Sequence, residues 1–225
     1  SLHDALPISV DVRVHRRYNP EGLSRYNIVP GLIGTILTMT MVMLTSLAMT
    51  RERERGTLEH LLVMPVTPFE IMAAKVLAMA AVVLLASAFS LNVVVRGLMG
   101  VPIEGSLPLF FTGAALHLFA TTSLGIFLAT LARSMPQFGM LLLLVLLPLQ
   151  MLSGGSTPRE SMPELVQLAM LAAPNTHFVM LSQALLYRGA GLAVVWPQFI
   201  SLAVIGAALF LFSLARFRKT ISQMA

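Results

Sequence analysis

The chain has 225 residues, of which 56% are hydrophobic and only 11% are charged, and it contains no cysteine. A soluble domain usually carries about 25% charged residues, so this composition excludes an ordinary soluble enzyme or binding domain. The absence of cysteine excludes a disulfide framework and a thiolate metal site. The formal net charge of +5 would indicate nucleic acid in a soluble protein. Here it is better explained as a bias between loops on the two sides of a membrane.

Five segments of at least 20 residues contain no Asp, Glu, Lys or Arg. A helix needs about 20 apolar residues to cross the hydrocarbon core of a bilayer. A buried soluble core would explain one such segment, but not five at nearly regular spacing. The segments are 26–50, 76–95, 105–132, 134–158 and 189–215. They predict an all-α membrane protein with spans at about 28–50, 76–95, 108–131, 138–153 and 193–215.

The basic residues outside these spans favour one orientation. With the N-terminus outside and five spans, eight Lys and Arg residues fall on one side and three on the other. The eight are Arg51, Arg53, Arg55, Lys75, Arg133, Arg216, Arg218 and Lys219, and the three are Arg96, Arg159 and Arg188. The positive-inside rule places the C-terminal tail, 220–225, in the cytoplasm. The arginines before the first span disagree, but the rule is weak for segments attached to long exported domains.

The residues before the first span, 1–27, form a separate arm. Val10, Val12 and Val14 alternate with polar residues, which predicts a short strand. The chain does not begin with Met, and its first residues form neither a signal peptide nor a span. We interpret 1–27 as the end of a periplasmic domain, with 1–9 as non-native sequence.

A block of alternating charge, Arg51-Glu52-Arg53-Glu54-Arg55, follows the first span. The helix of that span is expected to continue through the block, where opposite charges three positions apart attract each other. Leu58, Leu61 and Leu62 then form an apolar stripe at helical spacing. Met64-Pro65 ends this piece.

A second helix is expected to begin at Pro68, because Thr67 and Glu70 can form a capping box around it. The segment 51–75 therefore consists of two amphipathic pieces that meet at a proline-containing elbow, with spans on both sides. This shape suits a coupling element inserted in a groove of a soluble protein. A solvated loop that binds anionic lipid explains the same features equally well.

The region 154–190 breaks the pattern of spans, because Gly154-Gly155-Ser156-Thr157-Pro158 cannot be helical throughout. Two short helices are expected after it. The residues that predict their ends are Ser161 with Glu164 (a capping box), Pro174 (a stop), Asn175 or Thr176 (a cap) and Gly189 (a C-terminal stop). Short apolar helices between full spans indicate re-entrant or interfacial elements, whose broken backbone must be covered by protein or a water-filled cavity.

Two stretches resemble a known family. "RERERGTLEHLLVMPVTPFEIMAAK" is similar to the cytoplasmic coupling region of ABC-2 type transporter permeases. "LSGGSTPRESMPELVQ", followed by "APNTHFV" and the span that contains Trp196, is similar to the outer segment and final helix of the same permeases. The resemblance covers about residues 10–225. It is nearest to bacterial inner-membrane permeases that carry a large periplasmic domain after their first span.

The resemblance implies a fold and a set of partners. The fold is the transmembrane helical bundle of the ABC-2 (type V) exporters, with six spans per subunit, of which this chain lacks the first. The implied partners are a cytoplasmic ABC ATPase subunit that binds the ATP, a second permease copy or a paralogue, membrane lipid and a periplasmic adaptor, with no nucleic acid. No cofactor, metal or catalytic residue is expected in this chain, which lacks a phosphate-binding loop.

By position, the resemblance also implies roles for residues. The residues expected to contact the ATPase are Glu52, Glu54, Gly56, Thr57, Glu59, Leu61 and Leu62. The residues expected to anchor the helix at the membrane surface are Arg51, Arg53 and Arg55. Gly154, Gly155 and Pro158 are expected in an extracytoplasmic gate.

Several polar residues inside the spans have simpler explanations than chemistry. His117 is a candidate proton relay, but a neutral histidine hydrogen-bonded to another helix is the favoured interpretation. Asn92 and Gln150 are expected to join helices rather than bind cargo. Ser153 or Ser156 with His117 or His177 would be needed for an intramembrane serine protease, and nothing in the sequence pairs them.

The sequence therefore predicts a non-enzymatic, multi-pass permease subunit of an ABC-2 exporter in the bacterial inner membrane. Efflux of drugs or other amphipathic compounds would be driven by ATP hydrolysis on a separate subunit. The alternative is a membrane scaffold or lipid-binding anchor that transports nothing. The apolar sequence does not identify the cargo.

Overall fold

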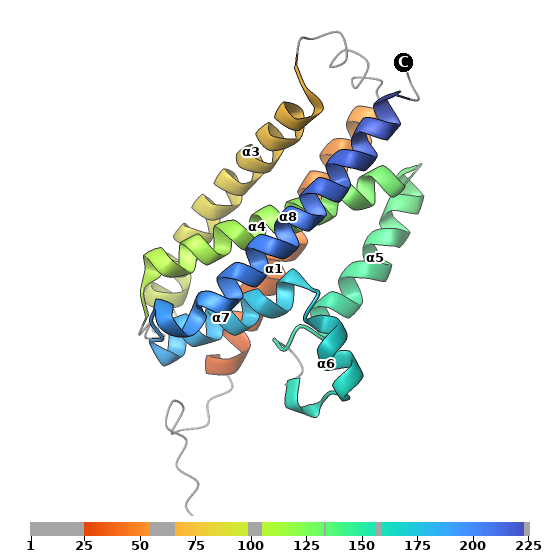
Figure 1. Ribbon diagram of the computed structural model, residues 1–225. Coiled ribbons are helices and arrows are strands. Elements are labelled where there is room, and N and C mark those ends of the chain that lie inside the picture. The colour runs from red at the N-terminus through yellow and green to blue at the C-terminus, as the bar shows by residue number, and fades with distance from the viewer. Residues whose placement is uncertain (1–24, 55–65, 99–104, 133, 156–158, 223–225) are drawn as a thin grey trace, which may run out of the picture.

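The computed structural model of the protein describes residues 25–54, 66–98, 105–132, 134–155 and 159–222, and within these residues every regular element is a helix (Figure 1). The elements are α1 (Arg25–Glu54), α3 (Pro68–Phe89), the π-helix η1 (Ser90–Leu98) that continues α3, α4 (Leu107–Leu131), α5 (Met135–Met151), the 3-10 turn η2 (Arg159–Ser161), α6 (Glu164–Met170), α7 (Pro174–Arg188) and α8 (Leu192–Ser222). The all-α prediction is confirmed for this part of the chain. The expected strand near Val10 lies outside the described residues.

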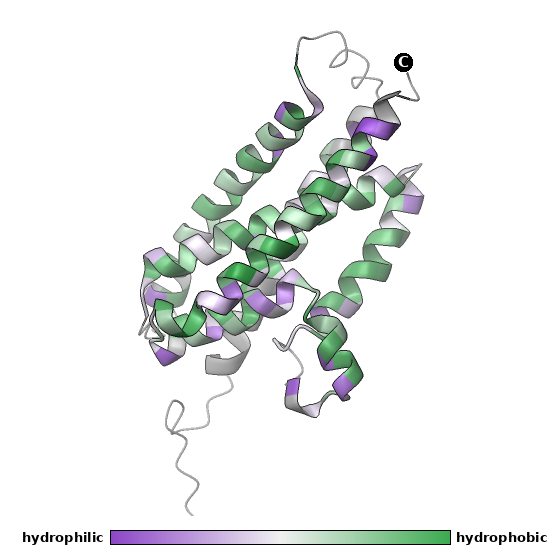
Figure 2. Ribbon diagram, viewed as in Figure 1, coloured by the Kyte–Doolittle hydropathy of each residue, from purple (hydrophilic) through white to green (hydrophobic). Residues whose placement is uncertain are grey.

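The outer surface of the bundle is apolar, as expected for helices that face lipid. Apolar residues follow α3, α5 and α8 along most of their length (Figure 2). On α3, Leu77, Leu85 and Phe89 are 70%, 73% and 67% exposed. Three helices are long and apolar enough to cross a membrane, namely Pro68–Leu98, Leu107–Leu131 and Leu192–Lys219. They contain the predicted spans 76–95, 108–131 and 193–215.

The other two predicted spans are covered by helices with shorter apolar runs. In α1 the apolar helix is Thr35–Thr45, and in α5 it is Pro136–Met151. A bent pair of helices, Glu164–Met170 and Pro174–Leu186, passes the same length and composition test together. The described residues thus contain three or four candidate spans, and five spans remain a prediction.

α4 is the central helix, packed against α8, α1, α7 and α3. Its packing depends on small residues, as the composition of 108–131 predicts. A Cβ atom added to Gly113 would lie 2.7 Å from a methyl group of Leu181 on α7. In the same way, a Cβ atom on Gly206 of α8 would lie 2.7 Å from the ring of Phe119 on α4. The three helices therefore approach one another more closely than larger residues would allow.

Between α5 and α8 the chain folds into the bent pair α6–α7 instead of a straight span. The axes of the two helices differ by 91°. Pro174 is the first residue of α7, and Gly189 ends it with a left-handed backbone at φ 59°. The predicted stop at Pro174 and the predicted end at Gly189 are confirmed.

Two predicted helix starts in this region are wrong. The N-cap of α6 is Pro163, without a side-chain cap, so Ser161 and Glu164 do not form a capping box. Ser161 instead belongs to the 3-10 turn η2. The N-cap of α7 is Ala173, also without a side-chain cap. Asn175 lies inside the first turn, where its side chain points to other helices.

Candidate functional site

The charged block lies at the same end of the bundle as two other helix ends. The last turn of α1 holds Arg51, which is exposed, and Glu52, Arg53 and Glu54 are helical there. Figure 1 shows that the end of α1, the start of α3 and the end of α8 lie together at this end. The end of α8 adds the exposed Arg216, Arg218 and Lys219. Of the eight basic residues that the count places on one side, those described at the ends of α1 and α8 therefore gather at this end, which we call the basic end.

Helix α3, which leads back from this end, begins with a complete N-terminal cap. The main-chain N–H group of Thr67 donates to Glu70 Oε2 at 2.6 Å, and the N–H group of Glu70 donates to Thr67 Oγ1 at 3.3 Å. This is the predicted capping box. The expected ATPase contacts Gly56, Thr57, Glu59, Leu61 and Leu62, and the expected anchor Arg55, lie outside the described residues. The block thus begins on α1 and is followed by a capped α3.

The predicted gate region follows α5 at the opposite end. Gly154 has φ 92°, a conformation that favours glycine, and a Cβ atom there would lie 3.0 Å from Arg159 Cγ. Arg159 donates to Met180 Sδ of α7 at 2.9 Å and to the carbonyl group of Gln167 at 3.4 Å. Gly155 is partly exposed, and Pro158 lies outside the described residues. One arginine thus ties the turn after α5 to α7.

A cluster of buried polar side chains joins four helices in the middle of the bundle. It consists of Thr38 of α1, His117 of α4, Gln150 of α5 and Asn175 of α7, and each is 7% exposed or less. His117 Nε2 lies 2.9 Å from Thr38 Oγ1. The hydroxyl group of Thr38 also bonds to Asn175 Oδ1. Asn175 Nδ2 donates to Gln150 Oε1 at 3.1 Å, and Gln150 Nε2 donates to the carbonyl group of Thr35 at 3.4 Å.

The direction of these hydrogen bonds follows from the single proton of a threonine hydroxyl. Thr38 donates that proton to Asn175, so its oxygen accepts from His117, which must carry a proton on Nε2. The other ring nitrogen, Nδ1, is buried and has no hydrogen-bond partner among the described groups. The imidazole ring stacks on Phe178 of α7, with ring centroids 4.4 Å apart and planes 14° apart. His117 is thus a neutral donor held between three helices.

This cluster was found only in part from the sequence. The interhelical roles of His117 and Gln150 are confirmed, but Asn92 is exposed and donates to the carbonyl group of Ala88 in its own helix at 2.8 Å. Thr38 was missed, although the threonines at positions 35, 38 and 45 share one face of α1. Ser153 donates to the Gln150 carbonyl group and His177 bonds to that of Leu171, so these two do not form a serine–histidine pair. Ser156 lies outside the described residues.

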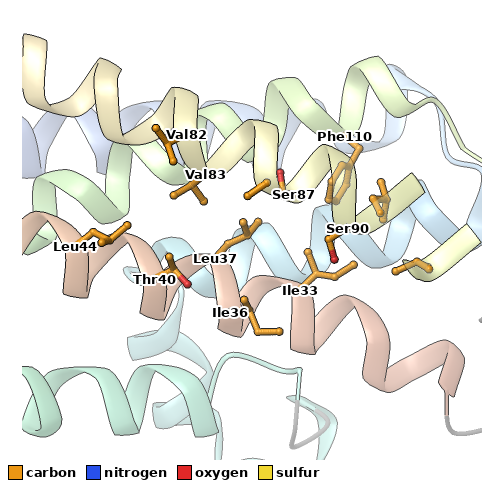
Figure 3. A pocket seen from close by; sticks show the side chains of 13 residues that line it. Ile33, Ile36, Leu37, Thr40, Leu44, Val82, Val83, Ser87, Ser90 and Phe110 are labelled. Carbon is orange, nitrogen blue, oxygen red and sulfur yellow. The ribbon is translucent and has the colours of Figure 1, made fainter. Parts of the chain in front are cut away.

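A groove of about 320 Å³ lies between α1 and the continuous helix α3–η1 (Figure 3). Thirteen residues line it, none of them charged, and Figure 3 shows Leu37, Val83 and Phe110 among them. Its polar side chains are hydroxyl groups, and that of Ser87 already donates to the carbonyl group of Leu84 at 2.8 Å. The groove thus offers an apolar surface at the side of the bundle, next to the turn of α1 that carries Thr38.

The family model described as "ABC-2 type transporter" matches residues 11–187. The chain belongs to the ABC-2 type transporter family. The chain is 59% identical over 222 residues to the Inner membrane transport permease YhhJ of Escherichia coli (strain K12). This match covers 96% of the chain and 58% of that relative. The chain is 30% identical over 218 residues to the Probable multidrug ABC transporter permease YbhR of the same organism, again covering 96% and 58%.

A third relative, the Probable multidrug ABC transporter permease YbhS of Escherichia coli (strain K12), is 33% identical over 181 residues, covering 80% of the chain and 48% of that protein. The chain therefore spans about half to three-fifths of the length of the curated relatives it matches. Its apolar helices and its relatives identify it as an integral inner-membrane protein of the transport permease type.

Proposed function

We propose that this chain forms part of the membrane-spanning subunit of an ABC-2 exporter. In this proposal the segment 51–75 docks on a cytoplasmic ATPase subunit, which binds and hydrolyses the ATP. The single observation that supports it is the basic end of the bundle, where the charged last turn of α1 and the capped first turn of α3 flank the segment 55–65. A partner that binds this segment would therefore act on α1 and α3 at the same time.

The cargo and assembly are part of the same proposal. Drugs or other amphipathic compounds are the proposed cargo, which agrees with the word "multidrug" in the names of two relatives. A second permease copy or a paralogue would supply the other wall of the pathway. The extracytoplasmic gate would be formed at Gly154, Gly155 and Pro158, and the bent pair α6–α7 would close it. Five spans with the C-terminus in the cytoplasm complete the topology.

The proposal is tested in the full-length permease. Glu59→Arg reverses a charge, and Leu62→Arg introduces one, in the segment that would enter the groove of the ATPase. Both variants are expected to lose co-purification with the ATPase and export of the cargo. Ser106→Arg is the control, because Ser106 is exposed at the opposite end of the bundle, before α4. Unchanged association and export in Glu59→Arg and Leu62→Arg would support the alternative of a scaffold or lipid-binding anchor.

A further inference from the structure

The bent pair α6–α7 has a tip, the turn where α6 ends and α7 begins, and this tip is hydrogen-bonded to α1 and α5. α7 begins at Pro174, directly after the 91° bend, and Asn175 is its second residue. The Asn175 side chain bonds to Thr38 of α1 and to Gln150 of α5. Because Gln150 also donates to the carbonyl group of Thr35, both routes from the tip lead to the same turn of α1.

Apart from the hydrogen bond that Arg159 donates to Met180 Sδ, these contacts differ in kind from the rest of the packing of α7. Further along, α7 is held by apolar side chains of the main core, including Phe178, Leu181 and Leu185. Apolar contacts are non-directional, so they tolerate small displacements of one helix along another. A hydrogen bond requires one distance and one direction, and a polar group left unpaired in an apolar interior is costly. The polar contacts therefore define one preferred position of the tip relative to α1.

α1 connects this position to the charged end of the bundle. The helix is continuous from Thr38 to Arg51, a length of about 20 Å at 1.5 Å per residue. The proline of α1, Pro30, comes before Thr38, so no proline interrupts this part. A displacement of the helix at Arg51 is thus carried to Thr38.

We propose that Thr38, Asn175 and Gln150 form a latch that holds the tip of α6–α7 against α1 in the resting protein, and that movement of α1 releases it. This inference rests on the proposed function, in which the ATPase moves α1. His117 is a positioning residue, because its donation from Nε2 to Thr38 Oγ1 leaves the hydroxyl proton of Thr38 for Asn175. A cluster that served only to fill the core would not control how often the tip opens.

The test measures opening directly in the full-length permease in proteoliposomes, without the ATPase. Ala173, the N-cap of α7, is 5% exposed and is replaced by cysteine as a reporter. Residues 1–225 contain no other cysteine, and any cysteine elsewhere in the full-length protein is first replaced by serine. The rate at which a membrane-impermeant maleimide labels the reporter reports opening of the tip. Thr38→Val removes the hydroxyl group at nearly constant volume. The labelling rate is expected to rise about threefold to tenfold, the factor for one or two interhelical hydrogen bonds in a membrane.

Two variants make this result specific. Thr122→Val is the matched control, because Thr122 is 0% exposed and donates to the carbonyl group of Leu118 within α4 at 2.6 Å. It is expected to label like the parent. Thr38→Ser keeps the hydroxyl group and is expected to restore the parent rate, which excludes a general loss of folding. Equal rates for Thr38→Val and Thr122→Val, or a Thr38→Ser protein that labels as fast as Thr38→Val, would overturn the latch.

A second experiment distinguishes a failure of the latch from a failure of the proposed function. When the ATPase and ATP are added to the protein with the Ala173→Cys reporter alone, labelling is expected to rise toward the Thr38→Val rate. If Thr38→Val opens the tip but the ATPase and ATP do not, the latch holds and the proposed drive through α1 fails. If ATP raises labelling while Thr38→Val has no effect, the drive holds and the latch is wrong.

Discussion

His117 Nε2 lies 2.9 Å from Thr38 Oγ1, although 79 positions separate the two residues along the chain. Both side chains are at most 1% exposed, so the contact joins α4 to α1 inside an apolar bundle. The same imidazole ring stacks on Phe178 of α7 at a centroid distance of 4.4 Å. One side chain thus fixes the relative positions of three helices.

His117→Leu is expected to lower the stability of the protein, because it removes the donor to Thr38 at similar volume. The loss should be about 1 kcal/mol, the scale of an interhelical hydrogen bond in a membrane protein. It is measured as a lower Tm in detergent. His117→Gln keeps a donor near the position of Nε2 and should lose less. A His117→Leu protein that is as stable as His117→Gln would show that the hydrogen bond contributes nothing.

Gly206→Ala is expected to destabilise the contact between α8 and α4. The added Cβ atom would lie 2.7 Å from the ring of Phe119 and 3.3 Å from the Cβ atom of Ala120, and overpacking of this kind costs about 1–3 kcal/mol. Gly139→Ala in α5 is the matched control, because nothing lies within 4 Å of its added Cβ atom. Its stability should stay the same or rise, since alanine favours a helix over glycine by about 0.5–1 kcal/mol. Equal Tm values for the two variants would contradict the close approach of α8 and α4.

Thr67→Ala is expected to loosen the first turn of α3, which begins next to the segment that would meet the ATPase. The loss of an N-cap side chain costs about 1 kcal/mol of helix stability. Faster hydrogen exchange of the main-chain N–H groups near Glu70 would report it. Thr67→Ser keeps the capping oxygen and should exchange like the parent protein. If both variants exchange at the parent rate, the capping box does not hold the start of this helix.

The parts of the fold that follow from local chemistry could be read from the sequence. Uncharged segments marked α3, α4 and α8, the pair Thr67 and Glu70 marked the start of α3, and Gly189 marked the end of α7. Each of these signals lies within a few residues of the feature it causes. The π-helix η1 was not predicted, because nothing near Ser90–Leu98 distinguishes it from the end of an ordinary span.

The candidate site depended on contacts that a single sequence does not contain. Asn175 was interpreted as a helix cap, with Thr176 as the alternative, because asparagine and threonine are among the residues preferred at that position. Ala173 occupies the cap position of α7 without a side-chain hydrogen bond. The Asn175 side chain bonds instead to Thr38 of α1, which lies 137 positions away in the sequence. For Asn92 the error was the reverse: it was predicted to join two helices, but its side chain bonds within its own helix. For these residues the sequence shows which groups are polar but not which groups they meet.

The central claim is that the segment 51–75 faces the cytoplasm, where an ATPase can move it. Single cysteines at Val66 and Ser106, both exposed and at opposite ends of the bundle, test this in the full-length permease with a membrane-impermeant maleimide. Val66→Cys is expected to be labelled in inside-out vesicles and protected in spheroplasts, with the reverse for Ser106→Cys. Labelling of Val66→Cys in intact spheroplasts would place the segment on the wrong side of the membrane and contradict the account.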